Sequence, residues 1–456
     1  MTQNSQRIHF IAIGGSIMHS LAICLAKAGH KVSGSDDHFH EPSKSKLMEL
    51  GLLPENEGWD ANRIDSSLDF VILGMHAKAN NPELLKAQEL GVKVLSFPEY
   101  IYEASKNKQR LVIAGSHGKT SMTAIVMHVL QEIGRDFDYM VGARINGFDE
   151  QVKLSDAPII VIEGDEYLTS PLDPRPKFFH YKHDIVTVSG IAWDHYNVFP
   201  TLDNYISQFE LLADSSAKGS TLIYCQEDDL TTKVIGGKER PGVTTIPYKA
   251  LDHVVRDGVT YLKLPDGEIK IEIFGYHNMQ NLSGVKALLK EIGVTDDQFY
   301  KAITTFTGAG KRMEILGKSD SSIIYTDFAH APSKLLATTS ALKNQFPNRF
   351  LVACLELHTF SSLNKEFINQ YKDTFNDSDE AIIFINPEAV KQKGLEPLTE
   401  ADLRKAFNRK DIILFNDSAK LNDHLMQHSW ANKNLILMSS GNFGGLNLQA
   451  LKQHIL

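Results

Sequence analysis

The segment of the sequence with the clearest chemical character is RLVIAGSHGKTSMTAIV, residues 110–126. It reads as a buried strand, a short loop with two glycines, and a helix that begins at a Lys-Thr pair. In such a loop the backbone N–H groups face an anion, Lys119 adds a positive charge, and the hydroxyl of Thr120 or Ser121 can hold Mg²⁺. An ordinary strand-to-helix turn is the alternative, because Ile113 stands where the general GxxxxGK[ST] pattern has its first glycine. The sequence predicts a phosphate-binding loop formed by Gly115, Ser116, His117, Gly118, Lys119, Thr120 and Ser121.

Acidic side chains follow two further strands. Glu163, Asp165 and Glu166 come directly after the apolar run of residues 157–162, and Asp194 and His195 follow a second apolar run. The carboxyl ends of strands line the ligand crevice of an open α/β sheet. Carboxylate and imidazole groups beside a phosphate loop therefore suit a Mg²⁺ ion that offsets phosphoryl charge, although solvated strand ends are the simpler alternative.

Residues 275–284, GYHNMQNLSG, open a predicted helix that carries His277, Asn278 and Asn281. The two asparagines are three residues apart, so they share a helix face and could bind the edge of a purine through their amides. Capping of the helix N-terminus by Asn278 explains the same pattern equally well.

Two more polar groups lie near the start of the last third of the chain. GAGKRMEILG places Lys311 and Arg312 in a glycine-rich hinge, where a basic pair could clamp a triphosphate or simply form a solvated turn. TDFAHAP ends a predicted strand with Asp327 and His330.

The N-terminal turn AIGGSIM has glycines only at positions 14 and 15, and Asp36 follows about twenty residues later. Ala12 and Ile17 stand where a dinucleotide-binding GxGxxG fingerprint has further glycines. The turn therefore fits a nucleotide-diphosphate site better than an NAD site.

The elements that must position these groups alternate between strands and helices along almost the whole chain. Such alternation predicts parallel sheets covered by helices on both faces, the α/β class. Residues 231–274 differ, because short strands with Gly and Pro indicate antiparallel hairpins. The polar segment 103–109 marks a domain boundary, and a further α/β region begins near Gly317.

Length and composition agree with this organisation. The 456 residues predict about three domains, and the net charge of 47 − 56 = −9 argues against a general nucleic-acid-binding surface. Three widely spaced cysteines form no metal-binding or disulfide pattern, which favours a reducing, cytoplasmic compartment. Nineteen uncharged residues between Arg7 and Lys27 approach the length of a membrane span, but their histidines and Gly-Gly pair indicate strand, turn and helix, without membrane insertion.

Taken together, the motifs resemble the Mur ligase family, ATP-dependent amide ligases of peptidoglycan metabolism. GSHGKTS resembles the family's GTxGKT loop, EGDE its acidic strand end and DHYN its DHxD motif; YHNMQN, KRME and DFAHAP follow in the family's order, so the resemblance covers essentially the whole chain. It implies a Rossmann-like domain for a UDP-sugar over residues 1–107, a central P-loop ATPase domain over 108–314, and a Rossmann-like closing domain over 315–456.

The resemblance also implies roles for individual residues. It assigns ATP to residues 115–121 with a second set, His277, Asn278, Asn281, Arg312, Asp327 and His330. It assigns Mg²⁺ to Thr120, Glu163 and His195, and catalysis to Lys119, His195 and Arg312. The UDP pocket would be lined by Gly14, Gly15, Ser16 and Asp36.

Within the family, IAIGGSIM, EGDEYLTSPLDPRPKFFHY and MSSGNFGG are most similar to one branch. That branch joins the tripeptide L-Ala-γ-D-Glu-meso-diaminopimelate to the lactyl carboxylate of UDP-N-acetylmuramate in peptidoglycan recycling, through an acyl phosphate. ELHTFSS, residues 356–362, resembles a segment of the sister branch that adds L-alanine in biosynthesis, so L-alanine stays the alternative amine. A P-loop small-molecule kinase and a nucleotide-gated binding protein are alternatives from other classes. We expect a monomer or weak homodimer.

Four positions can be compared with the residues that the family usually carries there, and three of them depart from the family's motifs. Ala192 replaces a glutamate, Asn197 replaces the last Asp of DHxD, and Ala331 replaces a His or Asn. The first two substitutions bear on metal or amine contacts. Phe209 stands where other branches carry a carbamylated lysine, as expected for the two muramate-using branches.

Overall fold

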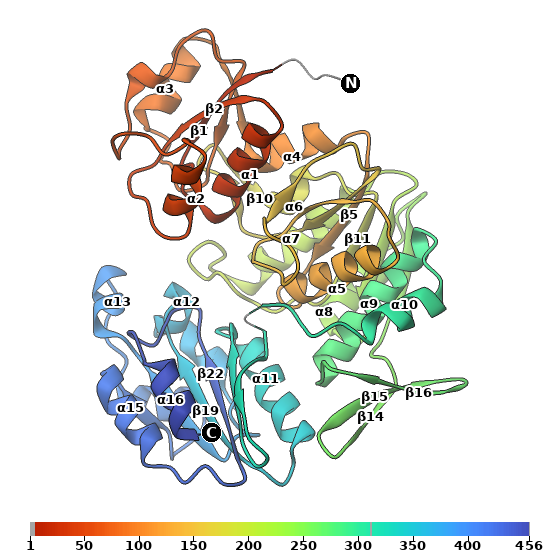
Figure 1. Ribbon diagram of the computed structural model, residues 1–456, viewed down its shortest axis with the longest axis vertical. Helices are drawn as coiled ribbons and strands as arrows, with labels where there is room; N and C mark the ends of the chain where they lie inside the picture. The colour runs from red at the N-terminus through yellow and green to blue at the C-terminus, as the bar shows by residue number, and fades with distance from the viewer. Residues whose placement is uncertain (1–4, 311, 456) are drawn as a thin grey trace.

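The computed structural model describes residues 5–310 and 312–455, which build three successive α/β units (Figure 1). The first unit has a parallel sheet in the order β2-β1-β3-β4. Its elements are β1 (Arg7–Ile11), α1 (Ser16–Lys27), β2 (Lys31–Ser35), α2 (Ser43–Glu49), η1 (Ala61–Arg63), β3 (Phe70–Leu73), α3 (Pro82–Glu89), β4 (Lys93–Ser96) and α4 (Phe97–Ser105). The long uncharged run is thus divided between β1, a turn and α1, and no described helix is long and apolar enough to cross a membrane.

The second unit contains a seven-stranded sheet in the order β13-β12-β11-β5-β8-β6-β7, in which only the β6–β7 pair is antiparallel. Its strands are β5 (Gln109–Ala114), β6 (Asp138–Met140), β7 (Val152–Lys153), β8 (Ile159–Glu163), β11 (Ile185–Val188), β12 (Thr221–Cys225) and β13 (Thr244–Tyr248). Its helices are α5 (Lys119–Glu132), α6 (Lys177–His180), α7 (Leu202–Asp214), α8 (Asp229–Thr231), η2 (Thr232–Gly236), α9 (Tyr276–Glu291) and α10 (Asp296–Ile303). A small hairpin joins β9 (Leu168–Ser170) to β10 (Asp173–Pro176).

The segment 231–274 is only partly the antiparallel hairpin predicted from the sequence. β14 (His253–Arg256), β15 (Val259–Leu264) and β16 (Gly267–Ile271) do form a separate antiparallel sheet. β13, however, pairs in parallel with β12 and extends the main sheet. The short sequence of β13 does not indicate which strand it pairs with, because the tertiary fold decides that pairing.

The third unit has the order β17-β18-β22-β19-β20-β21, parallel except for the edge strand β17. Its strands are β17 (Glu314–Lys318), β18 (Ile323–Asp327), β19 (Phe350–Glu356), β20 (Glu380–Phe384), β21 (Ile413–Phe415) and β22 (Lys433–Met438). Its helices are α11 (Pro332–Gln345), α12 (Phe360–Leu363), η3 (Phe367–Tyr371), α13 (Pro387–Gln392), α14 (Glu400–Ala406), α15 (Ser418–Met426) and α16 (Leu448–Ile455).

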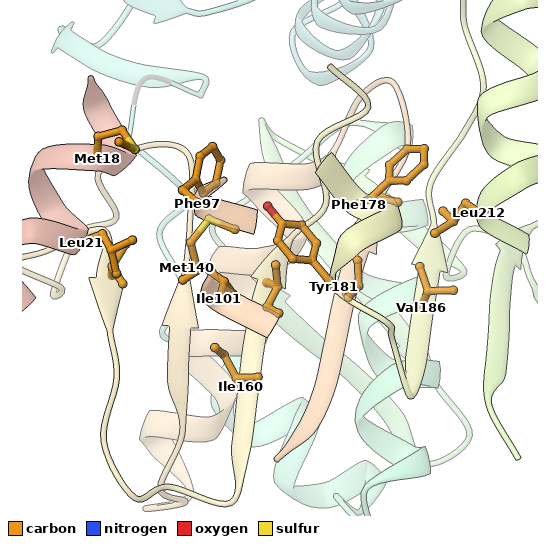
Figure 2. Close-up of a cluster of buried hydrophobic side chains, with 14 of the residues drawn as sticks. Met18, Leu21, Phe97, Ile101, Met140, Ile160, Phe178, Tyr181, Val186 and Leu212 are labelled. Atoms are coloured by element: carbon orange, nitrogen blue, oxygen red, sulfur yellow. The ribbon is translucent and has the colours of Figure 1, made fainter. Parts of the chain in front are cut away.

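One apolar core joins the first two units. Met18 and Leu21 of α1 and Phe97 of α4 are buried in the same cluster as Met140 of β6 and Tyr181, which follows α6 (Figure 2). Burial of side chains of this size contributes about 1.5–3 kcal/mol each. The shared core therefore fixes the N-terminal turn relative to the central sheet.

The third unit is attached to the second by polar contacts and aromatic rings. Gln345 at the end of α11 donates to the Gly258 carbonyl oxygen at 2.7 Å and accepts from the Thr260 hydroxyl at 3.1 Å. In the loop after β11, the Trp193 ring meets Phe367 of η3 edge to face and the Tyr196 ring meets it at a tilt, with ring centroids 5.5 and 5.9 Å apart. These contacts connect the C-terminal unit to the central one.

Candidate active site

The loop between β5 and α5 has the backbone of an anion cradle. Gly118 is the N-cap of α5 with φ +75°, and Gly115 has φ +125°. A Cβ atom at Gly115 would overlap the Ser189 hydroxyl, and one at Gly118 would lie 2.5 Å from Asn281 Oδ1. Both positions therefore require glycine for conformation and for space. The first residues of α5, 119–121, line a cleft, so the N-terminus of the helix is accessible to a phosphate.

Lys119 lies folded back over this loop. Its ammonium donates to the Gly115 carbonyl oxygen and to Glu166 Oε2, both at 2.6 Å. Burial opposes charge on Lys119, but Glu166 and Asp165 outweigh it and raise the lysine pKa. Burial likewise opposes charge on Glu166, yet Lys119 and His195 lower its pKa to about 2. Both groups are thus ionised at neutral pH, and the lysine is positioned beside the cradle before any anion arrives.

Thr120 and Glu163 form the second part of the cradle. The Thr120 hydroxyl donates to Glu163 Oε1 at 3.0 Å, and the backbone N–H of Gly142 donates to Glu163 Oε2 at 3.0 Å. Burial raises the Glu163 pKa, which a cation would reverse. A hydroxyl and a carboxylate beside a phosphate loop are the hard oxygen donors that Mg²⁺ prefers, so these residues fit the ion.

His195 lies against a different carboxylate from the one expected. Its Nε2 is 3.6 Å from Glu166 Oε1, which also accepts a hydrogen bond from the Tyr205 hydroxyl at 3.0 Å. Burial opposes protonation of His195, but Glu166 and Asp194 raise its pKa. Asp165, Glu166 and His195 place their ligand atoms within 4.8 Å of one another. The three residues predicted for Mg²⁺ are therefore divided between a Thr120–Glu163 pair and a His195–Glu166 pair.

The start of α9 does not have an asparagine cap, which was one of the two alternatives for Asn278. Gly275 is the N-cap with φ +90°, and no side chain caps the helix. Asn278 lies inside the first turn, donates to the Phe274 carbonyl oxygen at 2.8 Å, and accepts from Asn281 at 3.2 Å. Capping by Asn278 was the wrong alternative, because the glycine already takes the positive φ that ends the preceding loop. His277 is neutral at pH 7, since burial lowers its pKa to about 4.

The C-terminal unit contributes the opposite wall. Asp327, the last residue of β18, accepts from the backbone N–H groups of Met313 and Ala329 at 2.8 and 2.7 Å. Arg312, in the segment just before β17, joins this wall, because its guanidinium lies over the Phe328 ring, 4.8 Å from the centroid. Burial is the main reason that the pKa of His330 falls to about 3. Lys311 lies outside the described residues.

A cleft of about 670 Å³ lies between the two walls. It is lined by most of the residues predicted to hold ATP: residues 116–121 with His277, Asn278, Asn281, Arg312, Asp327 and His330. Glu163, predicted for Mg²⁺, lines it as well. Gly115 and His195 are not part of this lining. The structure thus gathers groups that are more than 200 residues apart in sequence around a single space large enough for a nucleotide.

The four residues predicted for the UDP-sugar lie outside this cleft, at the turn between β1 and α1. The backbone N–H of Gly14 donates to Asp36 Oδ2 at 2.7 Å, and burial raises the Asp36 pKa to about 6. The Ser16 hydroxyl donates to Gln151 Oε1 of the central unit at 3.0 Å. Gly15 is the N-cap of α1, with an extended backbone and no side-chain cap. The turn therefore joins Gly14 to Asp36, whereas the Ser16 side chain contacts the central unit.

Several residues at the site were not found from the sequence. Lys334 pairs with Asp194 at 3.2 Å and so connects α11 to the central unit. Tyr205 bonds Ser116 at 2.7 Å as well as Glu166, and Lys177 pairs with Asp165 at 2.5 Å. Tyr205 belongs to no motif, and Lys334 lies two residues after DFAHAP. Lys177 lies within EGDEYLTSPLDPRPKFFHY, but nothing in that segment indicates that its side chain pairs with Asp165.

The four positions compared with the family pattern have structural roles. The backbone N–H of Ala192 donates to the Ser116 hydroxyl at 2.8 Å, and Asn197 donates to the Tyr167 hydroxyl at 3.0 Å. Ala331 is the N-cap of α11. Phe209 is fully buried and lies against Tyr205 with ring centroids 5.4 Å apart. Apolar packing thus occupies the position that a modified lysine would need.

Comparison with known proteins gives matches along the chain. Residues 7–109 match the family model described as "Mur ligase family, catalytic domain", and residues 113–289 match "Mur ligase middle domain". The UDP-N-acetylmuramate–L-alanyl-γ-D-glutamyl-meso-2,6-diaminoheptandioate ligase of Haemophilus influenzae is 26% identical, with 98% of each chain covered. The UDP-N-acetylmuramate–L-alanine ligase of Lactobacillus delbrueckii subsp. bulgaricus is 30% identical, covering 84% of this chain and 85% of the relative.

The fold matches solved structures as well. The crystal structure of a murein peptide ligase from Psychrobacter arcticus superposes with a TM-score of 0.66 at 20% identity, with 99% of each chain covered. Likeness at this identity concerns the fold alone. It confirms the predicted fold class, a three-unit α/β architecture with a P-loop in the central unit.

Proposed function

Because the chain belongs to the Mur ligase family, we propose that it joins a peptide amine to the lactyl carboxylate of UDP-N-acetylmuramate at the expense of ATP. The proposed amine substrate is the tripeptide L-Ala-γ-D-Glu-meso-diaminopimelate, which the Haemophilus influenzae relative takes by its name. A role in the recycling of peptidoglycan in the cytoplasm follows from this substrate. Residues 1–107 would bind the UDP-sugar, residues 108–314 ATP, and residues 315–456 would close over both.

The observation that carries the proposal is the composition of the cleft. One wall holds a phosphate cradle with a charged lysine, and the other holds Asp327, His330 and Lys334 from the C-terminal unit. A carboxylate does not condense with an amine unaided, because oxide is a very poor leaving group. Transfer of the γ-phosphoryl group to the carboxylate solves this problem, and a cleft between two units can exclude water from the resulting acyl phosphate.

Each residue then has a defined task. Lys119 would leave Glu166 for the β- and γ-phosphates and offset the charge that develops during transfer, with Arg312 on the opposite wall. Thr120 and Glu163 would hold Mg²⁺, which supplies positive charge to the phosphates. Glu166, released from Lys119, keeps its hydrogen bond from Tyr205 and its neighbour His195, so it stays ionised. These side chains bind and orient the substrates and neutralise phosphate charge. The covalent bonds that form and break are those of the substrates themselves.

L-Alanine is a second candidate for the amine. The relative with 30% identity is named for L-alanine, whereas the relative with the larger coverage is named for the tripeptide. Coverage alone does not separate the two amines, because the UDP-N-acetylmuramate–L-alanine ligase of Lactobacillus acidophilus is 28% identical with 97% of each chain covered. The segments EGDEYLTSPLDPRPKFFHY and MSSGNFGG, which are most similar to the tripeptide branch, favour the tripeptide.

The test is a product assay. The protein is incubated with ATP, Mg²⁺ and UDP-N-acetylmuramate, together with either the tripeptide or L-alanine, and the product is identified by mass. We expect ligation and stoichiometric ADP with the tripeptide and at least tenfold less with L-alanine. ADP release that does not require any amine would contradict the proposal and indicate a kinase.

A further inference from the structure

A second cluster of metal-ligating side chains lies in the C-terminal unit, away from the cleft. Glu380 is the first residue of β20, His424 lies in the last turn of α15, and His428 follows two residues after the end of that helix. Both imidazole Nε2 atoms point at the same oxygen, Glu380 Oε1, at 2.8 Å from His424 and 3.3 Å from His428. We propose that these three residues form a binding site for one Zn²⁺ ion or a similar divalent transition metal, independent of the proposed ligase reaction.

The geometry suits the coordination of such an ion. The three ligand atoms lie within 4.8 Å of one another, and two ligands bound at about 2.0–2.2 Å in a tetrahedron are separated by about 3.3 Å. The observed separations of 2.8 and 3.3 Å to Glu380 therefore need only a small outward shift. Two imidazoles and one carboxylate leave the fourth position to water, a ligand set that zinc commonly accepts.

The surroundings hold the ligands in place but leave them accessible. The side chains of His424, His428 and Glu380 are 28%, 13% and 16% exposed. The His424 ring packs on Phe415, and the His428 ring packs on Trp430, with centroids 5.2 and 5.1 Å apart. Rings that are fixed in this way lose little freedom when they bind a metal, which favours affinity.

One neighbour opposes the metal. The Lys433 ammonium lies 3.3 Å from His428 Nδ1. A metal on Nε2 requires a proton on Nδ1, and a lysine, which can only donate, cannot accept from that proton. Lys433 must therefore turn away when the metal binds, and it lowers the affinity of the site. A glutamine at this position would accept the Nδ1 proton, as carboxylates and carbonyls do behind many metal-bound histidines.

The position of the site indicates a structural role. Glu380 begins β20, whereas Asp327 ends the parallel strand β18, so the two residues lie at opposite edges of the C-terminal sheet. Figure 1 shows α15 at the outer side of this unit, far from α5. A bound ion would connect α15 to β20 and stabilise the folded C-terminal unit without touching the reaction.

The experiment uses the full-length protein after treatment with chelator, without ATP or Mg²⁺. Zn²⁺ binding is measured by calorimetry, and Co²⁺ binding by its visible absorption. A second group, Asp165, Glu166 and His195, can also take a metal. The number of Zn²⁺ ions bound at the new site is therefore the number bound by the wild type minus the number bound by a ligand variant, His424→Gln, Glu380→Gln or His428→Gln. The control is His454→Gln, an exposed histidine on α16.

We expect the wild type and His454→Gln to bind one more Zn²⁺ per chain than each ligand variant. Zn²⁺ at a hundredfold excess over Kd should raise the Tm of these two proteins by about 2 °C or more, and not that of the ligand variants. Lys433→Gln, which keeps all three ligands, should bind about tenfold more tightly. Equal stoichiometry and affinity in wild type and the ligand variants would overturn the site, and weaker binding by Lys433→Gln would overturn the role given to Lys433. Ligase activity of His428→Gln in Mg²⁺ should equal that of wild type, and its loss would contradict a site outside the reaction.

Discussion

Replacement of Gly118 by alanine tests the packing of the phosphate cradle. Gly118 has φ +75°, and its added Cβ would lie 2.5 Å from Asn281 Oδ1. The left-handed backbone costs an alanine about 1 kcal/mol. Asn281 must also leave its rotamer, which costs about 0.5–1.5 kcal/mol, and lose its hydrogen bond to Asn278, worth about 1 kcal/mol. We expect Gly118→Ala to lower the free energy of unfolding by about 3 kcal/mol.

The other end of the same helix provides a matched control. Gly134 follows α5 with φ +67°, and a Cβ there would have no heavy atom within 4 Å. Gly134→Ala therefore carries the cost of the backbone conformation alone, about 1 kcal/mol. The effect of alanine on the unfolded chain is the same in both variants, so it cancels in their difference. The difference of about 2 kcal/mol reports the contact with Asn281.

Denaturant unfolding of both variants measures this difference, and ADP release measures its consequence. Asn281 lines the cleft, so its displacement should lower kcat/KM for ATP at least tenfold in Gly118→Ala, with little change in Gly134→Ala. Adding Asn281→Ala should cancel most of the extra destabilisation, because it removes the atom that the Cβ meets. Equal destabilisation by the two glycine variants, with normal turnover in Gly118→Ala, would refute the close packing of the cradle on α9.

Three further predictions concern charge and metal at the cradle. Lys119→Ala should abolish ADP formation, and normal turnover would contradict the role of Lys119. The affinity for UDP-N-acetylmuramate, measured by calorimetry, should change less than twofold, because the N-terminal turn is a separate site. Thr120→Val should raise the Mg²⁺ concentration needed for half-maximal activity about tenfold, whereas Thr120→Ser, which keeps the hydroxyl, should not; similar values for both would exclude Thr120 as a ligand. The folded-state pKa of Glu166 lies below its ordinary value of 4.5, at about 2, so its ionisation stabilises the fold above pH 4.5 and this stability is lost as the pH falls toward 2. Glu166→Gln should reduce the loss of unfolding free energy over that range by about 3 kcal/mol, measured by denaturant unfolding at several pH values. If the variant lost as much unfolding free energy as the wild type between pH 4.5 and 2, the ion pair of Glu166 with Lys119 would be contradicted.

The elements around the phosphate loop could be predicted because their signals are local. A run of apolar residues, two glycines and a Lys-Thr pair are contiguous in sequence, and β5, the loop and α5 follow them closely. The edge strands were less predictable. β13 has a short, half-exposed sequence, and its parallel partner β12 is fixed by the tertiary arrangement alone.

The partners within the site depend on the fold in the same way. Glu163 and Glu166 are three residues apart, and the sequence cannot tell which of them meets Lys119 and which meets Thr120. Tyr205 lies 89 residues from Ser116, and a tyrosine inside an amphipathic helix carries no sign that its hydroxyl reaches the phosphate loop. Sequence motifs identify the residues that bind ligands or take part in the reaction. The side chains that orient those residues can come from any element that packs nearby, so no motif marks them.

The central claim is that this cleft activates a carboxylate as an acyl phosphate. It is tested most directly with UDP-N-acetylmuramate whose lactyl carboxylate carries ¹⁸O in both oxygens, incubated with ATP, Mg²⁺ and the tripeptide. One ¹⁸O should appear in the inorganic phosphate and one should remain in the amide product, measured by mass spectrometry. Release of phosphate without ¹⁸O during product formation would contradict the account.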